Sequence, residues 1–341
     1  SAPKAVPLSN KNLITNIRAC LDVLQAVRSD VVLGILPPFH SFGLLANLLA
    51  PILAGARMVH HPDPTDAAGL VRVIAAYGAT IAVTTPTFLG YMLSAARPQQ
   101  LRTVRILVTG AEKCPEAVFQ QAERLAPQAI LLEGYGITEC SPVVAANRPE
   151  RMKRGAIGLP VQNVEVCVVD PESFQPLPPG KTGMLLVSGP SVFRGYLAHP
   201  GPPPFVELDG KPWYVTGDLV QQDEEGFLFF QGRLKRFLKA GGEMISLPAL
   251  EEPLANRYPP TEQGPQVAVE GIETPDGPRI ALFTTRDISL QEANAILAEA
   301  GFRGVMRIHQ VIRLEKLPVL GTGKTDYKVL RSMLAEKSAN V

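Results

Sequence analysis

The chain has 341 residues, and its 33 lysines and arginines nearly balance 32 aspartates and glutamates, giving a formal net charge of +1. This balance argues against nucleic acid or an acidic membrane surface as the main partner, because both select basic surfaces. The four cysteines show no Cys-x-x-Cys spacing, which indicates reduced residues in a cytoplasmic segment and excludes a disulfide framework or a zinc site. Hydrophobic residues make up 46% of the chain, enough for two or three compact units.

The first 150 residues alternate between helix-like and strand-like patterns. Ser9 suits the N-cap of a first helix, whose apolar residues recur at three- and four-residue steps. The elements that follow are strands at 31–36, 79–84, 104–109 and 129–133, and helices at 44–54, 66–77, 86–93 and 115–125. This alternation predicts right-handed βαβ units around a mostly parallel sheet. The ligand crevice of such sheets lies beyond the carboxyl ends of the strands.

Two further sequence patterns follow this first part of the chain. Strand-like runs at 164–169, 183–188 and 226–231 are separated by proline and glycine turns. After Gly232, strands at 266–269, 279–284 and 307–314 accompany a helix capped by Ser289. We therefore expect an α/β fold with a mostly parallel sheet and helices on both faces over residues 1–154. A β-rich subdomain over 155–232 and a compact α+β domain over 233–341 complete the expected architecture.

Six loop segments combine glycine with ionisable residues. They are LPPFHSFG (36–43), VTGAE (108–112), GYGITECSP (134–142), YVTGD (214–218), GRLKRFLKAGGE (232–243) and LPVLGTGKTDYK (317–328). In this order they resemble the acyl-adenylate-forming (AMP-binding) superfamily of acyl-CoA synthetases, luciferases and peptide-synthetase adenylation domains, over essentially the whole chain. The runs at 233–246 and 317–326 more narrowly resemble the acyl-acyl-carrier-protein synthetase half of bifunctional 2-acylglycerophosphoethanolamine acyltransferases.

The resemblance implies a nucleotide site around the loop at 134–142. Glu139 matches the glutamate that holds Mg²⁺ on the phosphates of ATP, and a hard cation prefers such an oxygen ligand. Thr138 can hydrogen-bond phosphate, although a helix-capping pair is the alternative for these two residues. Tyr135 resembles the aromatic residue that lies against adenine, and Gly136 belongs to the same loop.

A second loop would line the other side of the adenine. Gly110, Ala111 and Glu112 resemble this segment, and small residues suit a backbone that approaches a flat ring. His40 matches a position near the entry of the acyl carboxylate, although a lone histidine near apolar residues is more often structural.

Two residues resemble the ribose ligands of the family. Asp218, expected to follow a strand, matches the carboxylate that accepts both ribose hydroxyls, since an ionised aspartate takes two donors at once. Arg233 resembles the second ribose ligand. Without the resemblance, Thr-Gly-Asp would indicate only a turn.

The C-terminal segment supplies a lysine and a hinge. Lys324 resembles the lysine that reaches the α-phosphate and carboxylate oxygen during adenylation, where a compact ammonium suits the developing charge. A Walker A loop is excluded because its first glycine would fall on Pro318. Lys235 matches the hinge about which the small domain rotates, so that Lys324 leaves and residues 239–243 face a channel for the thiol. Alternatively, Gly241-Gly242 is a plain hairpin turn.

One motif of the resemblance is incomplete. The Ser/Thr/Gly-rich phosphate loop of the family ends in Pro-Lys, and only this tail is present, as Pro3-Lys4. We expect the chain to be the back half of a longer protein that, alone, binds nucleotide weakly and adenylates slowly, because the backbone N–H cradle is missing.

The resemblance implies an ATP- and Mg²⁺-dependent acid–thiol ligase. A fatty acid would be the substrate and the phosphopantetheine thiol of acyl carrier protein the acceptor. A fatty-acyl-CoA ligase is the first alternative, an amino-acid adenylation domain the next, and a catalytically inactive AMP-binding or self-associating fragment the last. An upstream membrane-associated acyltransferase region would place the full-length protein at the inner membrane.

Overall fold

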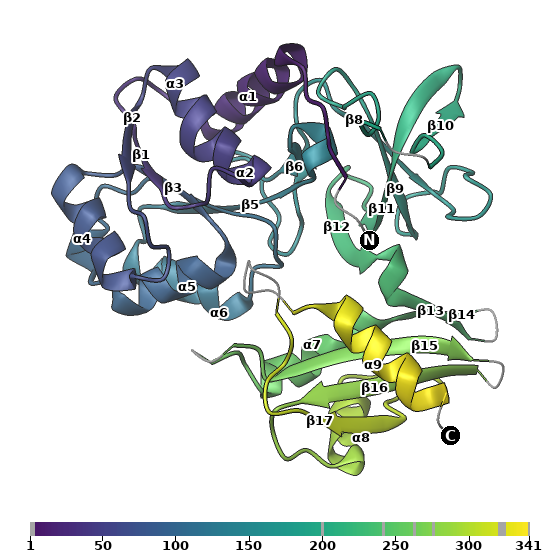
Figure 1. The fold of residues 1–341 in the computed structure, drawn as a ribbon. Helices are drawn as coiled ribbons and strands as arrows, with labels where there is room; N and C mark the ends of the chain where they lie inside the picture. Colours follow the sequence, from purple (N-terminus) through teal and green to yellow (C-terminus); the bar gives the residue numbers. More distant parts are fainter. Residues whose placement is uncertain are drawn as a thin grey trace. The chain divides into compact units, whose positions relative to one another are not determined.

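The computed structural model describes residues 4–198, 201–240, 243–261, 264–274, 277–319 and 325–339. These form two compact units (Figure 1), the larger from residues 1–216 with 220–230 and the smaller from residues 217–219 with 231–341. The predicted boundary at residue 155, between the α/β part and the β-rich subdomain, lies inside the larger unit. This subdivision of the larger unit stays a prediction.

A seven-stranded sheet forms the first part of the larger unit, in the order β2-β1-β3-β4-β5-β6-β7. Its strands are β1 (Val31–Gly34), β2 (Arg57–His60), β3 (Ile81–Thr84), β4 (Ile106–Thr109), β5 (Ile130–Gly136), β6 (Val143–Ala146) and β7 (Leu159–Pro160). The strands from β2 to β5 in this order are parallel, whereas β6 and β7 pair antiparallel. The predicted α/β fold with a mostly parallel sheet is confirmed.

Helices cover both faces of this sheet (Figure 1). The helices α4 (Ala67–Tyr77), α5 (Pro86–Ala95) and α6 (Glu116–Leu125) cover one face, where Leu33 and Leu107 belong to the core. The opposite face carries α1 (Asn10–Leu24), with Val32 and Ile106 in its core. Neighbouring strand residues thus enter opposite cores, which explains the nearly continuous apolar strand sequences.

The β-rich part of the larger unit has the strand order β10-β11-β9-β8, with β12 beside β11. Its strands are β8 (Glu165–Val169), β9 (Thr182–Ser188), β10 (Phe205–Leu208), β11 (Lys211–Gln222) and β12 (Leu228–Arg233). The aromatic rings of Phe193 and Tyr214 pack edge to face in its core, with centroids 5.2 Å apart.

The smaller unit has a three-stranded sheet and a hairpin. The sheet joins β15 (Val267–Thr274), β16 (Gly277–Thr284) and β17 (Gln310–Arg313), and the hairpin joins β13 (Phe237–Ala240) and β14 (Glu243–Ser246). The helices α7 (Leu247–Arg257) and α8 (Leu290–Glu299) contribute to one core, and α9 (Tyr327–Ala339) contributes to a second. Ser289 caps α8, as predicted.

Several element boundaries differ from the predicted ones. The strand predicted at 31–36 ends at Gly34, because the Asn47 amide, in the orientation that satisfies both groups, accepts from the backbone N–H groups of Ile35 and Leu36. The helix predicted at 44–54 begins earlier, as α2 (Ser41–Leu44), and continues through a π-helical turn (Leu45–Leu49) into α3 (Ala50–Ala54). The sequence patterns do not predict β2, β6, β7, β10, α7 and α9.

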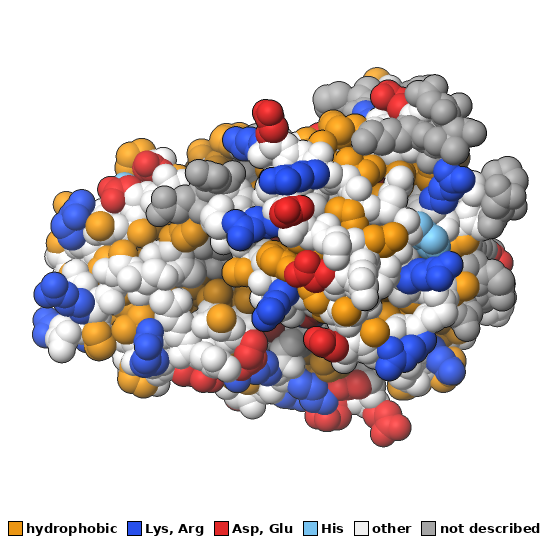
Figure 2. Space-filling model, turned by 90° about the horizontal axis from the view of Figure 1, so that it is seen from below, with side chains coloured by type: hydrophobic (Ala, Val, Ile, Leu, Met, Phe, Trp, Pro, Cys, Tyr) orange, Lys and Arg blue, Asp and Glu red, His pale blue; other side chains and the backbone are white. Residues whose placement is uncertain are grey.

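The charge distribution on the surface and the hydrophobicity of the helices reflect the composition of the chain. Acidic and basic side chains are interspersed on the face in Figure 2, as expected for a net charge near zero. Within the part of the chain that the structure describes, no helix is both long and apolar enough to cross a membrane.

Candidate active site

The loop after β5 carries the predicted nucleotide ligands of the larger unit. β5 runs parallel to β4 up to Glu133 and then pairs antiparallel with β6 from Gly134 onward. Tyr135 and Gly136 therefore lie on the strand, not in a loop after residue 133 as predicted, because β6 supplies a hydrogen-bonding partner that lengthens β5. The Tyr135 ring packs against Phe230, with the two centroids 5.9 Å apart.

The close packing of this loop requires glycine at position 136. A Cβ atom there would lie 2.5 Å from the carbonyl oxygen of Pro142. The backbone N–H of Ile137 donates to the same carbonyl at 2.8 Å, which closes the loop between β5 and β6. The Ser141 hydroxyl donates to the Ser191 carbonyl at 2.7 Å and thereby ties the loop to the β-rich part.

Glu139 is half-buried and lies in a short 3-10 turn (Thr138–Cys140). The hydroxyl of Tyr196 donates to Glu139 Oε1 at 2.7 Å, and the N–H of Phe193 donates to its backbone oxygen at 2.8 Å. Burial is the main cause that raises the pKa of Tyr196, to about 12, so this phenol is a neutral donor at physiological pH. The carboxylate of Glu139 is thus oriented by a neutral group.

Two further loops meet the β5 loop. The Thr138 hydroxyl lies 3.0 Å from that of Ser41, the residue after His40. His40 itself is exposed and caps α2, its Nδ1 accepting from the N–H of Phe42 at 3.3 Å. The sequence-predicted His40 segment and the Thr138–Glu139 turn are therefore neighbours, although the described His40 contact is a local cap.

Gly110 joins the same cluster of loops. A Cβ atom on Gly110 would lie 3.2 Å from the carbonyl oxygen of Gly134 and 3.3 Å from the ring of Phe42. Ala111 has a left-handed backbone with φ +69°. The Glu112 carboxylate instead accepts from the Thr87 hydroxyl at 2.7 Å. The loops after β1, β4 and β5 thus lie together at the carboxyl end of the sheet, as the topology predicts.

The tail of the expected phosphate loop reaches this site. The Lys4 ammonium lies 4.5 Å from the centroid of the Tyr196 ring. Pro3 lies outside the described residues. Tyr196 thus contacts both Lys4 and Glu139, a role that the sequence reasoning missed, because a tyrosine after Arg194-Gly195 in an irregular segment carries no periodic signal.

The predicted ribose ligands lie in the smaller unit. Asp218 is 3% exposed and lies within β11, not after a strand as predicted. The strand continues past it because Leu219 and Val220 are buried core residues. Arg233 ends β12, and its Nε lies 3.4 Å from Asp218 Oδ1. The two predicted ligands therefore form an ion pair with each other.

The predicted hinge and lysine complete the set. Lys235 is exposed in a short 3-10 turn (Leu234–Arg236), and its carbonyl oxygen accepts a hydrogen bond from Arg331. Lys324 and the pair Gly241-Gly242 lie outside the described residues. Within the described ranges, no cluster of three or more His, Cys, Asp and Glu could hold a metal ion.

The chemistry of Glu139 fits Mg²⁺ in a nucleotide complex. Mg²⁺ is held by one or two carboxylates together with waters and substrate phosphates, so a single well-placed carboxylate suffices. The Glu139 carboxylate has a phenol as its described side-chain partner, which leaves oxygen lone pairs for a cation.

This fold, with its loops gathered at the carboxyl end of a mostly parallel sheet, is that of adenylate-forming ligases. The sequence profile of the AMP-binding enzyme family matches residues 1–197, and the chain belongs to that family.

Two CoA ligases are similar in sequence to this chain over most of its length. It is 31% identical over 301 residues to a long-chain-fatty-acid–CoA ligase from Escherichia coli, covering 86% of this chain and 52% of the relative. It is 29% identical over 347 residues to 4-coumarate–CoA ligase 5 from Oryza sativa, covering 98% of this chain and 64% of the relative. The chain thus spans less than two thirds of the length of these relatives.

Solved structures show the same fold. The crystal structure of ATP-bound MatB from Rhodopseudomonas palustris matches with a TM-score of 0.84 and 26% identity, covering 97% of this chain and 65% of that one. An O-succinylbenzoate coenzyme A synthetase from Bacillus subtilis, in complex with ATP and magnesium ion, matches with a TM-score of 0.83 at 23% identity, over 96% of this chain and 67% of that one.

Proposed function

We propose that the protein to which this chain belongs is an acid–thiol ligase that activates a carboxylic acid with ATP and passes the acyl group to a thiol. The observation that carries the proposal is the turn at Thr138–Glu139. It presents a carboxylate and a hydroxyl at the carboxyl end of the sheet, beside the His40–Ser41 loop. One similar solved structure is ATP-bound and another is a complex with ATP and magnesium ion, which supports both as cofactors here.

In the first half-reaction, a carboxylate oxygen of the substrate attacks the α-phosphorus of ATP, and pyrophosphate leaves. Two anions must be held in line, so the site must neutralise charge. Glu139 would hold the Mg²⁺ that neutralises the phosphates, and Thr138 would donate to a phosphate oxygen. Tyr135 and the Gly110–Glu112 segment would bind adenine, His40 would lie near the carboxylate, and Lys324 would stabilise the developing charge.

In the second half-reaction, a thiolate attacks the acyl carbonyl carbon and AMP leaves, while the thiol proton passes to solvent. Rotation of the part of the smaller unit that follows Lys235 would remove Lys324 and admit the thiol, while Asp218 and Arg233, which precede Lys235 along the chain, would not take part in this rotation. Asp218 would accept the ribose hydroxyls in both steps, with Arg233 as the second ribose ligand.

We propose a fatty acid as the substrate. The name of the Escherichia coli relative, a long-chain-fatty-acid–CoA ligase, supports it. For the thiol, the names of the relatives favour coenzyme A, whereas the runs at 233–246 and 317–326 favour acyl carrier protein and a fused acyltransferase region.

The full-length polypeptide is the material for the test. Acid-dependent ATP–pyrophosphate exchange is measured with fatty acids of several chain lengths, and thioester is then measured with coenzyme A and with phosphopantetheinylated carrier protein. Exchange with fatty acids supports the ligase, and the thiol that gives more thioester identifies the acceptor. The absence of acid-dependent exchange would contradict the proposal. The 341-residue chain, assayed in parallel, is expected to exchange slowly.

A further inference from the structure

The segment that follows Lys235 is fixed to the smaller unit by a buried guanidinium. Arg236 Nη2 donates to Glu251 Oε2 at 3.0 Å and to the carbonyl oxygen of Val269 at 2.8 Å. The guanidinium carbon also lies 3.5 Å from the centroid of the Tyr327 ring. The Arg236 side chain is 16% exposed. The residue after the proposed hinge is therefore held by α7, β15 and α9 at once.

Glu251 is the junction of these contacts. Its Oε2 accepts from the N–H of Val269 at 2.7 Å as well as from Arg236, and its Oε1 accepts from the hydroxyl of Tyr327 at 2.5 Å. One carboxylate on α7 thus joins the segment after Lys235, the edge strand β15 and the first residue of α9.

A second guanidinium holds Lys235 itself. Arg331 on α9 donates to Glu270 Oε1 through Nε at 3.1 Å and Nη2 at 2.8 Å, and the same Nη2 donates to the backbone oxygen of Lys235. Glu270 is fully buried on β15. The peptide plane between Lys235 and Arg236 is consequently held from both sides.

Two charged groups of this network are buried and incompletely hydrogen-bonded, which a role in stability alone does not explain. Burial disfavours the charged form of Arg236, but Glu251, Tyr327 and Glu270 outweigh burial and raise its pKa. Arg236 Nε and Glu270 Oε2 are buried 4.0 Å apart, and neither has a hydrogen-bond partner among the described residues. Since buried ion pairs are often no more stabilising than apolar packing, a geometric role explains this arrangement better.

We propose that Arg236, Glu251, Glu270, Tyr327 and Arg331 form a hinge clamp, a set of positioning residues that confines rotation of the part of the smaller unit after Lys235 to the two backbone torsions of Lys235. The Cα atom of Lys235 lies in the peptide plane that the clamp holds, so its φ and ψ are the first torsions that remain free. The 3-10 hydrogen bond from Phe237 N to the Leu234 carbonyl spans Lys235, and this bond must open when Lys235 turns.

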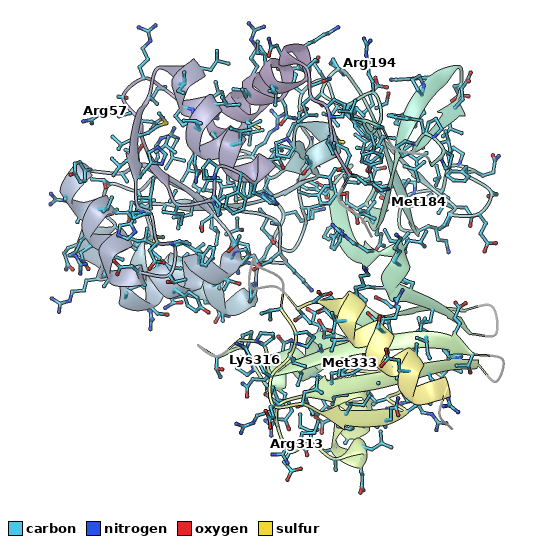
Figure 3. The ribbon with its side chains drawn as sticks, in the orientation of Figure 1. Arg57, Met184, Arg194, Arg313, Lys316 and Met333 are labelled. Atoms are coloured by element: carbon cyan, nitrogen blue, oxygen red, sulfur yellow. The ribbon has the colours of Figure 1, made fainter. Side chains whose placement is uncertain are left out.

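The hinge clamp rests on the proposed two-step cycle, and the test separates the two proposals. Arg331→Lys keeps a cation for Glu270 but lacks the planar fork that also reaches the Lys235 carbonyl. Tyr327→Phe removes only the hydroxyl on Glu251 and keeps the ring against Arg236. The matched control is Arg313→Lys on β17, labelled in Figure 3, whose exposed side chain has a long ion pair of 3.8 Å with Asp287.

Hydrogen exchange on the full-length protein is the first measurement. We expect both clamp variants to exchange the amides of residues 236–238 about tenfold faster, as for loss of one charge-assisted hydrogen bond, with the rest of the smaller unit and the control unchanged. The second measurement compares turnover with the pyrophosphate exchange half-reaction. The overall kcat should fall several-fold, while KM for ATP and fatty acid stays constant.

Two outcomes would overturn the hinge clamp. One is unchanged exchange at residues 236–238 in both variants. The other is faster exchange throughout the smaller unit together with a lower Tm, which indicates a structural role alone. If the wild-type protein forms no acyl adenylate, the proposed function fails, and the hydrogen-exchange comparison still decides whether these residues hold the segment after Lys235.

Discussion

Two carboxylate sites, one in each unit of the molecule, are held in opposite ways. In the larger unit, Glu139 is oriented by the neutral phenol of Tyr196. In the smaller unit, Glu251 and Glu270 are bound by the guanidinium groups of Arg236 and Arg331. A carboxylate held by a neutral donor keeps its charge available for an incoming cation, whereas one bound to arginine has its charge already compensated. The difference separates a carboxylate suited to a ligand from carboxylates suited to fixing the backbone.

The largest effect is expected at Glu139. Glu139→Gln keeps an oxygen that accepts from Tyr196 but removes the negative charge, so we expect fatty-acid-dependent adenylation by the full-length protein to fall by about 10²–10³-fold, typical of losing one electrostatic contact in a site. Pyrophosphate exchange over a range of Mg²⁺ concentrations measures this. The exposed Glu116→Gln on α6 is the control. A loss of less than threefold in the adenylation rate would contradict a role for Glu139 in the active site.

Glu270→Gln should show the opposite signature, a loss of stability. The change leaves Arg331 beside a neutral amide, and breaking a buried pair in this way costs about 2–3 kcal/mol here, because Arg331 retains some contact with water. Urea unfolding followed by a probe in the smaller unit measures the free energy, with the exposed Glu299→Gln as the control. Equal stability of the two variants would refute the difference between the Glu139 and Glu270 carboxylates.

A pH series extends the comparison to Asp30 in the larger unit. Burial would raise its pKa, but bonds from Arg105 at 2.9 and 2.7 Å, from the Val27 N–H and from the Thr80 hydroxyl lower it overall. A lowered folded-state pKa gives stability that is present above the unfolded value of about 3.9 and is lost as pH falls through the folded value. Asp30→Asn should therefore cost about 1.5–2 kcal/mol at neutral pH.

The same variant should flatten the acid limb of the stability curve below about pH 4. Glu133→Gln is the matched contrast, because burial raises the pKa of Glu133. A raised carboxyl pKa lowers stability as pH rises through it, so this variant should change the curve above the ordinary glutamate pKa instead. Denaturant midpoints from pH 3 to 8 in about unit steps decide the sign. Identical curves for both variants would contradict the opposite shifts.

The smallest effect is expected at Tyr196. Tyr196→Phe removes the donor to Glu139 without altering the aromatic packing, so adenylation should fall by about five- to tenfold, the usual worth of one hydrogen bond. Tyr214→Phe is the control, since its hydroxyl lies 3.4 Å from that of Tyr196. The affinity of each variant for Mg²⁺-ATP, measured by calorimetry, provides a second test. Equal losses in the two variants would argue against a specific role for Tyr196.

The parallel sheet could be predicted because its signals are local. The apolar strand runs and the cap at Ser9 lie within a few residues of the elements they define. The extension of β5 to Gly136 could not be predicted in this way, because it depends on pairing with β6, which lies beyond the loop. The position of Asp218 within a strand could not be predicted either, because β11 continues through it as a result of tertiary packing.

The site residues divide along the same line. Motif order predicts Tyr135, Thr138 and Glu139 as site residues, and the structure brings that loop beside Ser41 and Gly110. Tyr196 and the hinge clamp were missed, because their importance arises from contacts between residues far apart in the sequence, such as Tyr196 with Glu139 and Arg331 with Lys235. Such contacts leave no pattern in a single sequence.

The double pairing of β5 also bears on the order in which the protein folds. Gly136 and Val143 are partners across a short loop, and closing a short loop costs little chain entropy. The parallel pairing of β5 with β4 requires α6 to pack in between along the chain, and such non-local contacts form more slowly. We expect the turn that carries Glu139 to be closed early in folding, before the sheet that later supports it is assembled.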